Sequence, residues 1–492
     1  MKRTPVNMNF TQKITDKLSI SLIGNYIDER SQNRPYLSDG PLNANNGFFL
    51  ANNVDIRWLA PGFDPTTGNE VVFSDDIFVT NPYFVVNQFR NDLGRRRIIV
   101  TPSIKYDLFK WLYFQGRMGY DNSDDNSFSV TPWGTAYSQD RRGGLNGIGK
   151  SQITEINYEA LIGGNRDLTG DISMDFTLGA NKRVNRFESV SIGGGPFIVP
   201  YQYTFNNVVN FNRGYGFSKQ QVNSAFYSLD FAYKNLITLS TTGRYDAYST
   251  FPTDVAGIFT PSVSASFVFH DLLNAKALNY GKFRASFAQT SGEPQSPYTT
   301  SLYYSLGNTY NGLPLGNYSQ SLPNGLLRPF AVTEFEVGFD LRFFNSRVNL
   351  DFAAYTRETR DEIMPASYSI SSGFTSGFVA TGSTQNKGIE LQLTAIPIQT
   401  KNFSWTSSLN FTYVKNKILA TNPNGTNLNL GTNRAVIGNA VTAYAVGMAG
   451  PQIFAFDYRY DAKGDILVDG SGLPLRGNLI PMGSTLPTHY GG

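Results

Sequence analysis

The stretch Asn386–Lys417, NKGIELQLTAIPIQTKNFSWTSSLNFTYVKNK, alternates apolar and polar residues twice, on either side of a short polar turn. In its first half, four apolar residues occupy alternate positions, Ile389, Leu391, Leu393 and Ala395. The residues that alternate with them are Gly388, Glu390, Gln392 and Thr394. Its second half repeats the pattern with Phe403, Trp405, Leu409, Phe411 and Tyr413. Because successive side chains of a β-strand point to opposite faces, this period of two predicts a β-hairpin.

The same alternation recurs along the chain and predicts seven hairpins. The expected strand pairs are 5–13 with 18–27, 96–107 with 111–121, 152–165 with 171–183, 221–234 with 236–247 (turning at Lys234-Asn235), 258–269 with 281–290, 332–343 with 347–358, and the pair within 386–417. Most connections between the pairs are long and rich in Asn, Gly, Ser, Tyr and Pro: 28–95, 122–151, 184–220, 291–331, 359–384 and the residues after 416. Tight turns that alternate with long loops are typical of a membrane barrel with short periplasmic turns and long extracellular loops.

Composition narrows the class of protein. The 492 residues are 14% aromatic and only 16% charged, against about 25% charged residues in an ordinary soluble protein. The net charge of +3 gives no reason to expect a nucleic-acid partner. The absence of cysteine excludes disulfides, thiolate metal sites and a cysteine nucleophile. No run of about 18 apolar residues is present, which excludes a transmembrane helix.

A soluble sheet, with one face on a core and one in water, would also alternate. The expected strands, however, hold roughly 10–13 residues, where soluble strands average about 5–6 and bilayer-spanning strands need about 9–11. Aromatic residues that suit a membrane–water boundary fall near strand ends: Tyr26, Tyr106, Trp111, Tyr120, Tyr233, Tyr245, Trp405 and Tyr413. We therefore predict an all-β fold, a transmembrane antiparallel β-barrel of the outer membrane.

Several segments in order resemble the SusC/RagA family of TonB-dependent outer-membrane transporters. They are VTEFEVGFDLRFFNSRVNLDFAAYTRETRDEIM at 332–364, STQNKGIELQLTAIPIQTKNFSWTSSLNFTYVKNKIL at 383–419, VGMAGPQIFAFDYRYDAKGDILVDGSG at 446–472 and LPTHYGG at 486–492. The resemblance implies TonB-dependent import of oligosaccharides, peptides or similar large nutrients into a Gram-negative, Bacteroidota-like cell. It also implies a SusD-like surface lipoprotein as partner, and contact with the TonB complex through a plug domain.

Compared with that family, residues 1–492 look like part of a barrel, about 14 of an expected 22 or so strands. The signal peptide, the plug domain and the C-terminal strands are expected outside this stretch. A passive porin or adhesin-like barrel, which needs no plug, and an outer-membrane hydrolase are the alternative functions.

Motifs that suggest chemistry are weak. GLNGIGKS at 144–151 fits the P-loop pattern, but strand-like alternation follows it where a helix should begin, so we expect a glycine-rich loop tip and no nucleotide. The acidic residues of 121–125 and 457–469 lack EF-hand spacing and are expected in solvated turns, without a metal. The two histidines, His270 and His489, have no nucleophile placed beside them by the sequence, so no catalytic residue and no cofactor are predicted.

Aromatic and amide side chains in the 291–331 loop are the better candidates for binding, because flat rings beside amide donors suit sugars or peptides. The candidates for substrate contact are Tyr303, Tyr304, Tyr310, Asn311 and Tyr318; exposed loop residues without a role are the alternative. Charges expected on the inner face are Glu334, Glu336, Asp340, Arg342 and Glu390, and these are predicted to pair with one another or with a plug.

Overall fold

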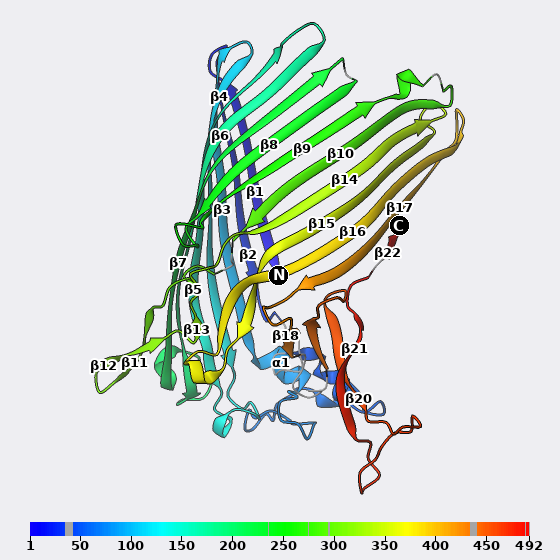
Figure 1. Ribbon diagram of the computed structural model, residues 1–492. Coiled ribbons are helices and arrows are strands. Elements are labelled where there is room, and N and C mark those ends of the chain that lie inside the picture. The colour runs from blue at the N-terminus through cyan, green and yellow to red at the C-terminus, as the bar shows by residue number, and fades with distance from the viewer. Residues whose placement is uncertain are drawn as a thin grey trace. The chain divides into compact units, whose positions relative to one another are not determined.

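The computed structural model describes residues 1–34, 43–234, 236–273, 275–293, 296–432, 440–487 and 489–491. Long antiparallel strands account for most of them (Figure 1). The chain divides into two compact units. Unit 1 comprises Met1–Leu108, Phe114–Ala160 and Asn181–Gln221, and unit 2 comprises Phe109–Tyr113, Leu161–Ala180 and Val222–Gly492.

Fourteen long strands match the seven predicted hairpins. They are β1 (Lys2–Lys13), β2 (Leu18–Ser31), β3 (Arg90–Phe109), β4 (Leu112–Thr131), β5 (Gly144–Asp167), β6 (Ile172–Phe197), β7 (Val208–Tyr233), β8 (Ile237–Tyr248), β9 (Gly257–Val268), β10 (Leu278–Gly292), β14 (Phe330–Phe343), β15 (Val348–Ser367), β16 (Ser376–Gln399) and β17 (Ser404–Ala420). Of the expected turn Lys234-Asn235, Asn235 lies outside the described residues. The all-β prediction is confirmed.

Each long strand is hydrogen-bonded to the strands next to it in sequence. In unit 1 the order is β1, β2, β3, β4 and β5, continued by parts of β6 and β7. In unit 2 it runs from β8 through β9, β10, β14, β15 and β16 to β17. Neighbouring strands paired in this way need only short turns, which is why the turns predicted between the strands of each hairpin are tight.

The prediction that 122–151, 184–220 and 359–384 are loops is wrong in large part, because strands extend into all three; β15 continues to Ser367 and β16 begins at Ser376. β4 continues to Thr131 and β5 begins at Gly144, while β6 continues to Phe197 and β7 begins at Val208. The β4 extension carries polar residues on both faces, in the sequence DNSDDNS at 121–127, and shows no apolar alternation. The β7 extension does alternate, with Val209, Phe211, Tyr215 and Phe217 on one face, so its sequence did indicate a strand. Backbone hydrogen bonding to neighbouring strands maintains the polar extension of β4 without an apolar face.

The same extension corrects two predictions about motifs. GLNGIGKS at 144–151 is the start of β5 and not a loop tip, and β5 continues after it as a strand instead of the helix that a phosphate-binding loop requires. The acidic residues of 121–125 lie in β4 and not in a turn.

The two faces of the sheet differ in polarity as predicted. In unit 2, β14 and β15 pair with Phe339 opposite Phe352, and the next pair along is Asp340 opposite Asp351. The face that carries the apolar side chains is accessible, since Phe335 is 50% exposed. In unit 1 the apolar set is continuous across strands: Val6 of β1 faces Tyr26 of β2, which faces Ile98 of β3. An accessible apolar face opposite a charged one is the arrangement of a barrel wall between lipid and a wet interior.

The connections between hairpins hold short elements. They are η1 (Ala44–Phe49), η2 (Ile56–Leu59), α1 (Pro82–Gln88), η3 (Gln139–Arg141), η4 (Phe205–Asn207), η5 (His270–Leu272), β11 (Tyr304–Tyr310), β12 (Leu313–Tyr318), β13 (Ser321–Leu322), η6 (Ile370–Ser372), β18 (Leu428–Thr432), β19 (Ala440–Tyr444), β20 (Gln452–Tyr458), β21 (Arg476–Ser484) and β22 (His489–Gly491). Among the described residues, no helix has both the length and the apolar character to cross a membrane.

Small apolar clusters lie at the loop ends of the long strands. Val130, Leu145, Phe197 and Val208 form one in unit 1, at the adjoining ends of β4, β5, β6 and β7. Val222, Tyr248, Phe251 and Leu327 form another in unit 2. A wall with lipid on one side and polar side chains on the other has no single core, so these buried clusters form where loops cover strand ends. Smaller ones lie at α1 and at β19 and β20.

Candidate functional site

The polar face of unit 2 is organised around Arg284 of β10. Its Nη1 donates to Asp340 at 2.8 Å and its Nη2 donates to Asp351 at 2.9 Å. Its Nε lies 3.5 Å from Glu336, and Lys282 lies 3.4 Å from the second oxygen of Asp340. One guanidinium thus joins three carboxylates on β14 and β15, with a second cation beside them.

A glycine makes this arrangement possible. Gly338 lies directly opposite Arg284 in the β10–β14 register. A Cβ at Gly338 would lie 2.7 Å from Cζ and Nε of Arg284 and 2.8 Å from the carbonyl oxygen of Phe352. The missing side chain therefore lets the guanidinium cross β14 and reach Asp351 on the strand beyond.

Three of the charges predicted on the inner face pair with arginines outside that set, and not with one another. Glu336 and Asp340 pair with Arg284, and Glu334 pairs with Arg357 of β15. Arg342 lies 5.0 Å from the centre of the Tyr280 ring in a cation–π contact. The sequence did not identify Arg284 as the common partner, since its partners are separated from it by 52 to 67 positions.

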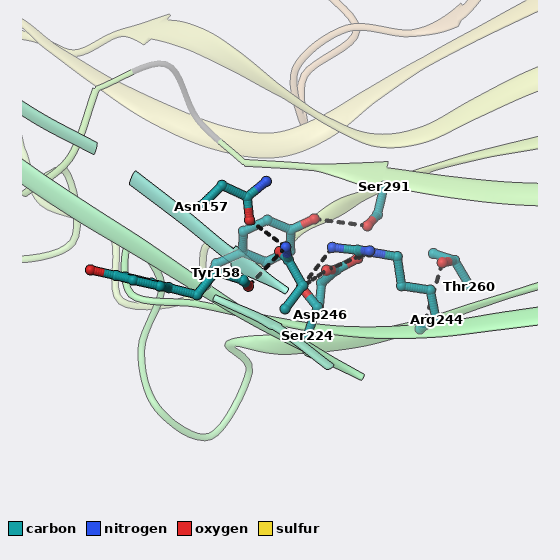
Figure 2. A network of polar contacts seen from close by, with 9 residues as sticks. Asn157, Tyr158, Ser224, Arg244, Asp246, Thr260 and Ser291 are labelled. Atoms are coloured by element: carbon teal, nitrogen blue, oxygen red, sulfur yellow. Dashed lines mark hydrogen bonds and ion pairs between the residues drawn. The ribbon is translucent and has the colours of Figure 1, made fainter. Parts of the chain in front are cut away.

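A second network in unit 2 joins β7, β8 and β9, as Figure 2 shows. Arg244 donates through Nε to both oxygens of Asp246, at 2.8 and 3.0 Å, and through Nη2 to Ser224 Oγ at 2.7 Å. Ser224 donates in turn to Asp246 at 2.5 Å, and Thr260 donates to the carbonyl oxygen of Arg244 at 3.2 Å. Since Asp246 is buried, the two donors compensate the loss of water around its carboxylate.

Unit 1 carries its own ion pairs on the polar face. Arg95 of β3 binds Asp125 of β4 through two hydrogen bonds of 2.8 and 2.7 Å. Arg97 binds Asp121 in the same two-bond manner, at 2.8 and 2.5 Å. Two of the three acidic residues of 121–125, Asp121 and Asp125, therefore pair with arginine, and Asp124 accepts a hydrogen bond from Asn122. Within the described part of the chain, no group of three or more His, Asp or Glu side chains is placed to hold a metal ion.

Of the acidic residues of 457–469, Asp461, Asp465 and Asp469 lie at turns as predicted, whereas Asp457 belongs to strand β20. Asp461 accepts backbone N–H groups from Lys463 at 2.8 Å and Asp465 at 2.9 Å. Asp469 accepts those of Ser471 and Leu473 in the same way. These bonds, with that from Asp465 the largest, lower the pKa of Asp461. The carboxylates thus stabilise tight turns.

The five loop residues predicted to contact substrate lie on or beside one hairpin. Tyr304 and Tyr318 are partners across β11 and β12. Tyr310 ends β11, and Asn311 with Gly312 forms the turn at φ 49° and 80°, as a two-residue I′ turn requires. Tyr303 precedes the hairpin, with its ring 6.5 Å from that of Tyr298. Tyr318 donates to the Gly373 carbonyl oxygen at 3.2 Å. The rings of Tyr304 and Tyr310 remain exposed.

The loop 43–89 contains a buried polar centre that the sequence did not reveal. Asn81 is fully buried, and its Nδ2 donates to the carbonyl oxygens of Leu59 at 3.1 Å and Val71 at 2.9 Å. Its Oδ1 accepts the N–H of Tyr83 at 3.0 Å, which caps α1. The dipeptide Asn81-Pro82, a capping residue followed by proline at the first helical position, was the available signal for this helix.

Glu70 links Asn81 to a second loop. Its Oε1 accepts the N–H of Asn81 at 2.8 Å and its Oε2 accepts that of Ala136 at 2.9 Å. Burial raises the pKa of Glu70, and the two backbone N–H groups only partly offset that effect. The loops 43–89 and 132–143 are thereby fastened together by one carboxylate.

The two histidines lie in ring contacts. His270 Nε2 lies 3.2 Å from the Asp271 carboxylate, and its ring centre lies 5.3 Å from that of Tyr280. His489 lies against Phe411 and Tyr413. Neither contact is with a serine or threonine nucleophile.

Comparison with known proteins gives consistent matches. A family model described as TonB dependent receptor-like, beta-barrel matches residues 24–478. TonB-dependent receptor P26 of Formosa agariphila is 26% identical over 462 residues, which cover 85% of this chain and 45% of that protein. TonB-dependent receptor SusC of Bacteroides thetaiotaomicron is 26% identical over 272 residues, covering 51% of this chain and 27% of SusC.

Among solved structures, that of the RagAB peptide importer in its closed-closed state superposes with a TM-score of 0.76 at 16% identity. The superposition covers 99% of this chain and 55% of that one. The chain spans about half the length, or less, of these relatives. The resemblance to SusC/RagA transporters is confirmed, and since the family match extends over most of the sequence, the chain belongs to the TonB-dependent receptor-like β-barrel family of the outer membrane.

Proposed function

We propose that this chain forms part of the barrel wall of a TonB-dependent importer of large nutrients, oligosaccharides or peptides. The observation that carries the proposal is the family match over residues 24–478, in strands with an accessible apolar face and a face of paired charges. Such a wall separates lipid from a wet interior. SusC and the RagAB peptide importer are named relatives of this chain.

The proposal includes partners. A SusD-like surface lipoprotein is expected to bind the outer end of the barrel, and the TonB complex is expected to act through a plug domain outside residues 1–492. The family is one of receptors and transporters, so we propose no catalytic residue, no cofactor and no metal.

Uptake measurements test this function. In the bacterium that carries the gene, we expect its deletion to abolish uptake of one class of labelled oligosaccharide or peptide, and deletion of tonB to abolish the same uptake. A monosaccharide that enters through general porins is the control and should enter normally in both strains. Uptake that persists without TonB would favour a passive porin instead, and cleavage of the substrate by the purified protein would favour a hydrolase.

We further propose that Tyr303, Tyr304, Tyr310, Asn311 and Tyr318 contact the substrate. Support comes from their gathering around the β11–β12 hairpin, where Tyr304 and Tyr310 are 75% and 68% exposed. Aromatic rings offer a large apolar face with few rotatable bonds, which favours binding at an exposed site.

Replacing both Tyr304 and Tyr310 with alanine is expected to raise the half-saturating substrate concentration of uptake about tenfold, with the maximal rate unchanged, because exposed aromatic anchors contribute about 1–2 kcal/mol to binding. Tyr215, which is 69% exposed on β7, provides the matched control, and Tyr215→Ala should leave uptake unaltered. An unchanged half-saturating concentration in the double variant would show that the hairpin does not bind substrate.

A further inference from the structure

Two lysines lie directly opposite each other on β16 and β17 in unit 2. Lys387 pairs with Lys415 in the register of the two strands, and the next pair on this face, toward the loops, is Gln385 with Lys417. Directly opposite side chains of antiparallel strands have Cβ atoms about 4.5–5.5 Å apart, so like charges at such positions repel each other. All three lysines are exposed. Three ammonium groups are thus held close together although they repel one another.

These lysines have no carboxylate to neutralise them within the part of the chain that the structure describes. None of the three forms an ion pair there. On the same face of β15, Glu358 lies opposite Gln385, but it is already bound by Arg360, whose Nε is 2.7 Å from its Oε1. The lysines therefore leave a patch of uncompensated positive charge on this face.

The lysine cluster lies on the lipid-facing side of the wall, where the apolar band ends. On this face the pair next to Lys387 and Lys415 is Ile389 with Tyr413. A tight turn joins the far ends of β16 and β17, which run side by side in Figure 1. Counted from that turn, the segment 389–399 supplies the about 9–11 residues that a strand needs to cross a bilayer. The lysines therefore lie just beyond the hydrocarbon, at the loop end, where the lipid headgroups begin.

Position and charge together select the chemistry of the ligand. A lysine at the edge of an apolar surface lays its stem along that surface and extends its ammonium group into the polar region. A phosphate accepts hydrogen bonds from several ammonium groups at once, because each lysine acts as a compact point charge with three donors. A soluble anion would meet the same charge but would gain nothing from the apolar band, whereas the acyl chains of a lipid would cover Ile389 and Tyr413.

We propose that Lys387, Lys415 and Lys417 form a site for the headgroup phosphate of an outer-leaflet lipid, whose acyl chains lie against the apolar band of β16 and β17. The phosphate lies between the opposed ammonium groups and removes their repulsion, so the bound lipid stabilises the pairing of these two strands. The site is on the outside of the wall and does not depend on which solute the importer carries.

Native mass spectrometry of the purified full-length protein in detergent tests the site, with monophosphoryl lipid A as the probe. Lys387→Gln with Lys415→Gln should weaken lipid binding by about tenfold or more, since each lysine near an anionic surface contributes about fivefold. Lys110→Gln with Lys401→Gln is the matched control. These two exposed lysines lie in tight turns at the opposite end of the strands, so loss of their charge should leave lipid binding unchanged.

A charge reversal gives a result that a merely structural role for these lysines would not produce. Lys415→Glu places a carboxylate opposite Lys387 and turns a repelling pair into an attracting one. We expect this variant to lose lipid binding and yet, without lipid, to unfold at a higher temperature than the wild type. Added lipid should raise the unfolding temperature of the wild type and leave that of the variant unchanged.

The outcomes separate a lipid site from its alternatives. Lipid binding lost in both cluster variants and kept in the turn variant would support the site. Equal binding by the wild type and the cluster variants would overturn it, and so would equal weakening in the turn variant, which would indicate attraction to the charge of the whole protein. Displacement of the lipid by an equal concentration of inorganic phosphate would indicate a site for free phosphate and overturn the assignment to lipid.

Discussion

Replacing Arg284 with alanine is expected to lower the free energy of unfolding by about 2–4 kcal/mol, because it leaves three partly buried carboxylates without their shared cation. Three carboxylates, those of Glu336, Asp340 and Asp351, lie within 3.5 Å of the guanidinium. Lys282 remains beside Asp340 but contacts one carboxylate only. The side chain of Arg284 is 27% exposed, so solvent screening keeps the effect below that of a fully buried pair.

Denaturant titration of the purified protein in detergent, followed by tryptophan fluorescence, measures this loss. Arg360→Ala is the matched control, since Arg360 pairs with Glu358 on the same wall but is 68% exposed, and it should leave the free energy of unfolding nearly unchanged. Arg284→Lys should fall between the two, because an ammonium cannot reach three carboxylates in one plane. Equal losses for Arg284→Ala and Arg360→Ala would show that the cluster is not a stabilising centre.

The second large effect is expected for Asn81→Ala, which should destabilise the loop 43–89 by about 3–5 kcal/mol through unsatisfied buried groups and a lost helix cap. The change removes the amide nitrogen that donates to the carbonyl oxygens of Leu59 and Val71. It also removes the amide oxygen that accepts the Tyr83 N–H at the start of α1. The bond from the Asn81 N–H to Glu70 is a backbone bond and survives the substitution. The loop should therefore open locally while the strands remain intact.

Hydrogen–deuterium exchange of peptides from residues 43–89 reports that opening directly. Asn87→Ala is the control, because the exposed Nδ2 of Asn87 makes a single bond of 3.2 Å, to the Pro61 carbonyl oxygen. Peptides from β3 and β4 should exchange as in the wild type in both variants. Faster exchange in these strands as well would mean that Asn81 stabilises the sheet and not the loop alone, which would contradict the assignment.

The strands and their two faces were predictable because the side-chain alternation of a strand is local. Phe335, Val337 and Phe339 lie on one face whatever strand pairs with them. The polar extension of β4 was not predictable from alternation, since residues 121–127 are polar on both faces. The β11–β12 hairpin could have been found, because Asn311-Gly312 between apolar residues is a strong signal for a tight turn.

The candidate site was predicted by residue type but not by partner. Tyr304 and Tyr318 were chosen as loop aromatics, and only the β11–β12 register shows them to be cross-strand neighbours. Asp121 and Asp125 were expected to be solvated, and the structure pairs them with Arg97 and Arg95. A carboxylate in the sequence carries no information about which arginine lies on the adjacent strand.

By itself the sequence determined that the chain forms long antiparallel strands with a lipid-facing and a polar face, since a period of two and the choice of residue at each position are properties of short segments. The tertiary structure alone decided which charges meet and where Gly338 admits Arg284. Those features depend on strand register between residues far apart in the chain, and register is fixed by the pairing of whole strands, not by any one segment.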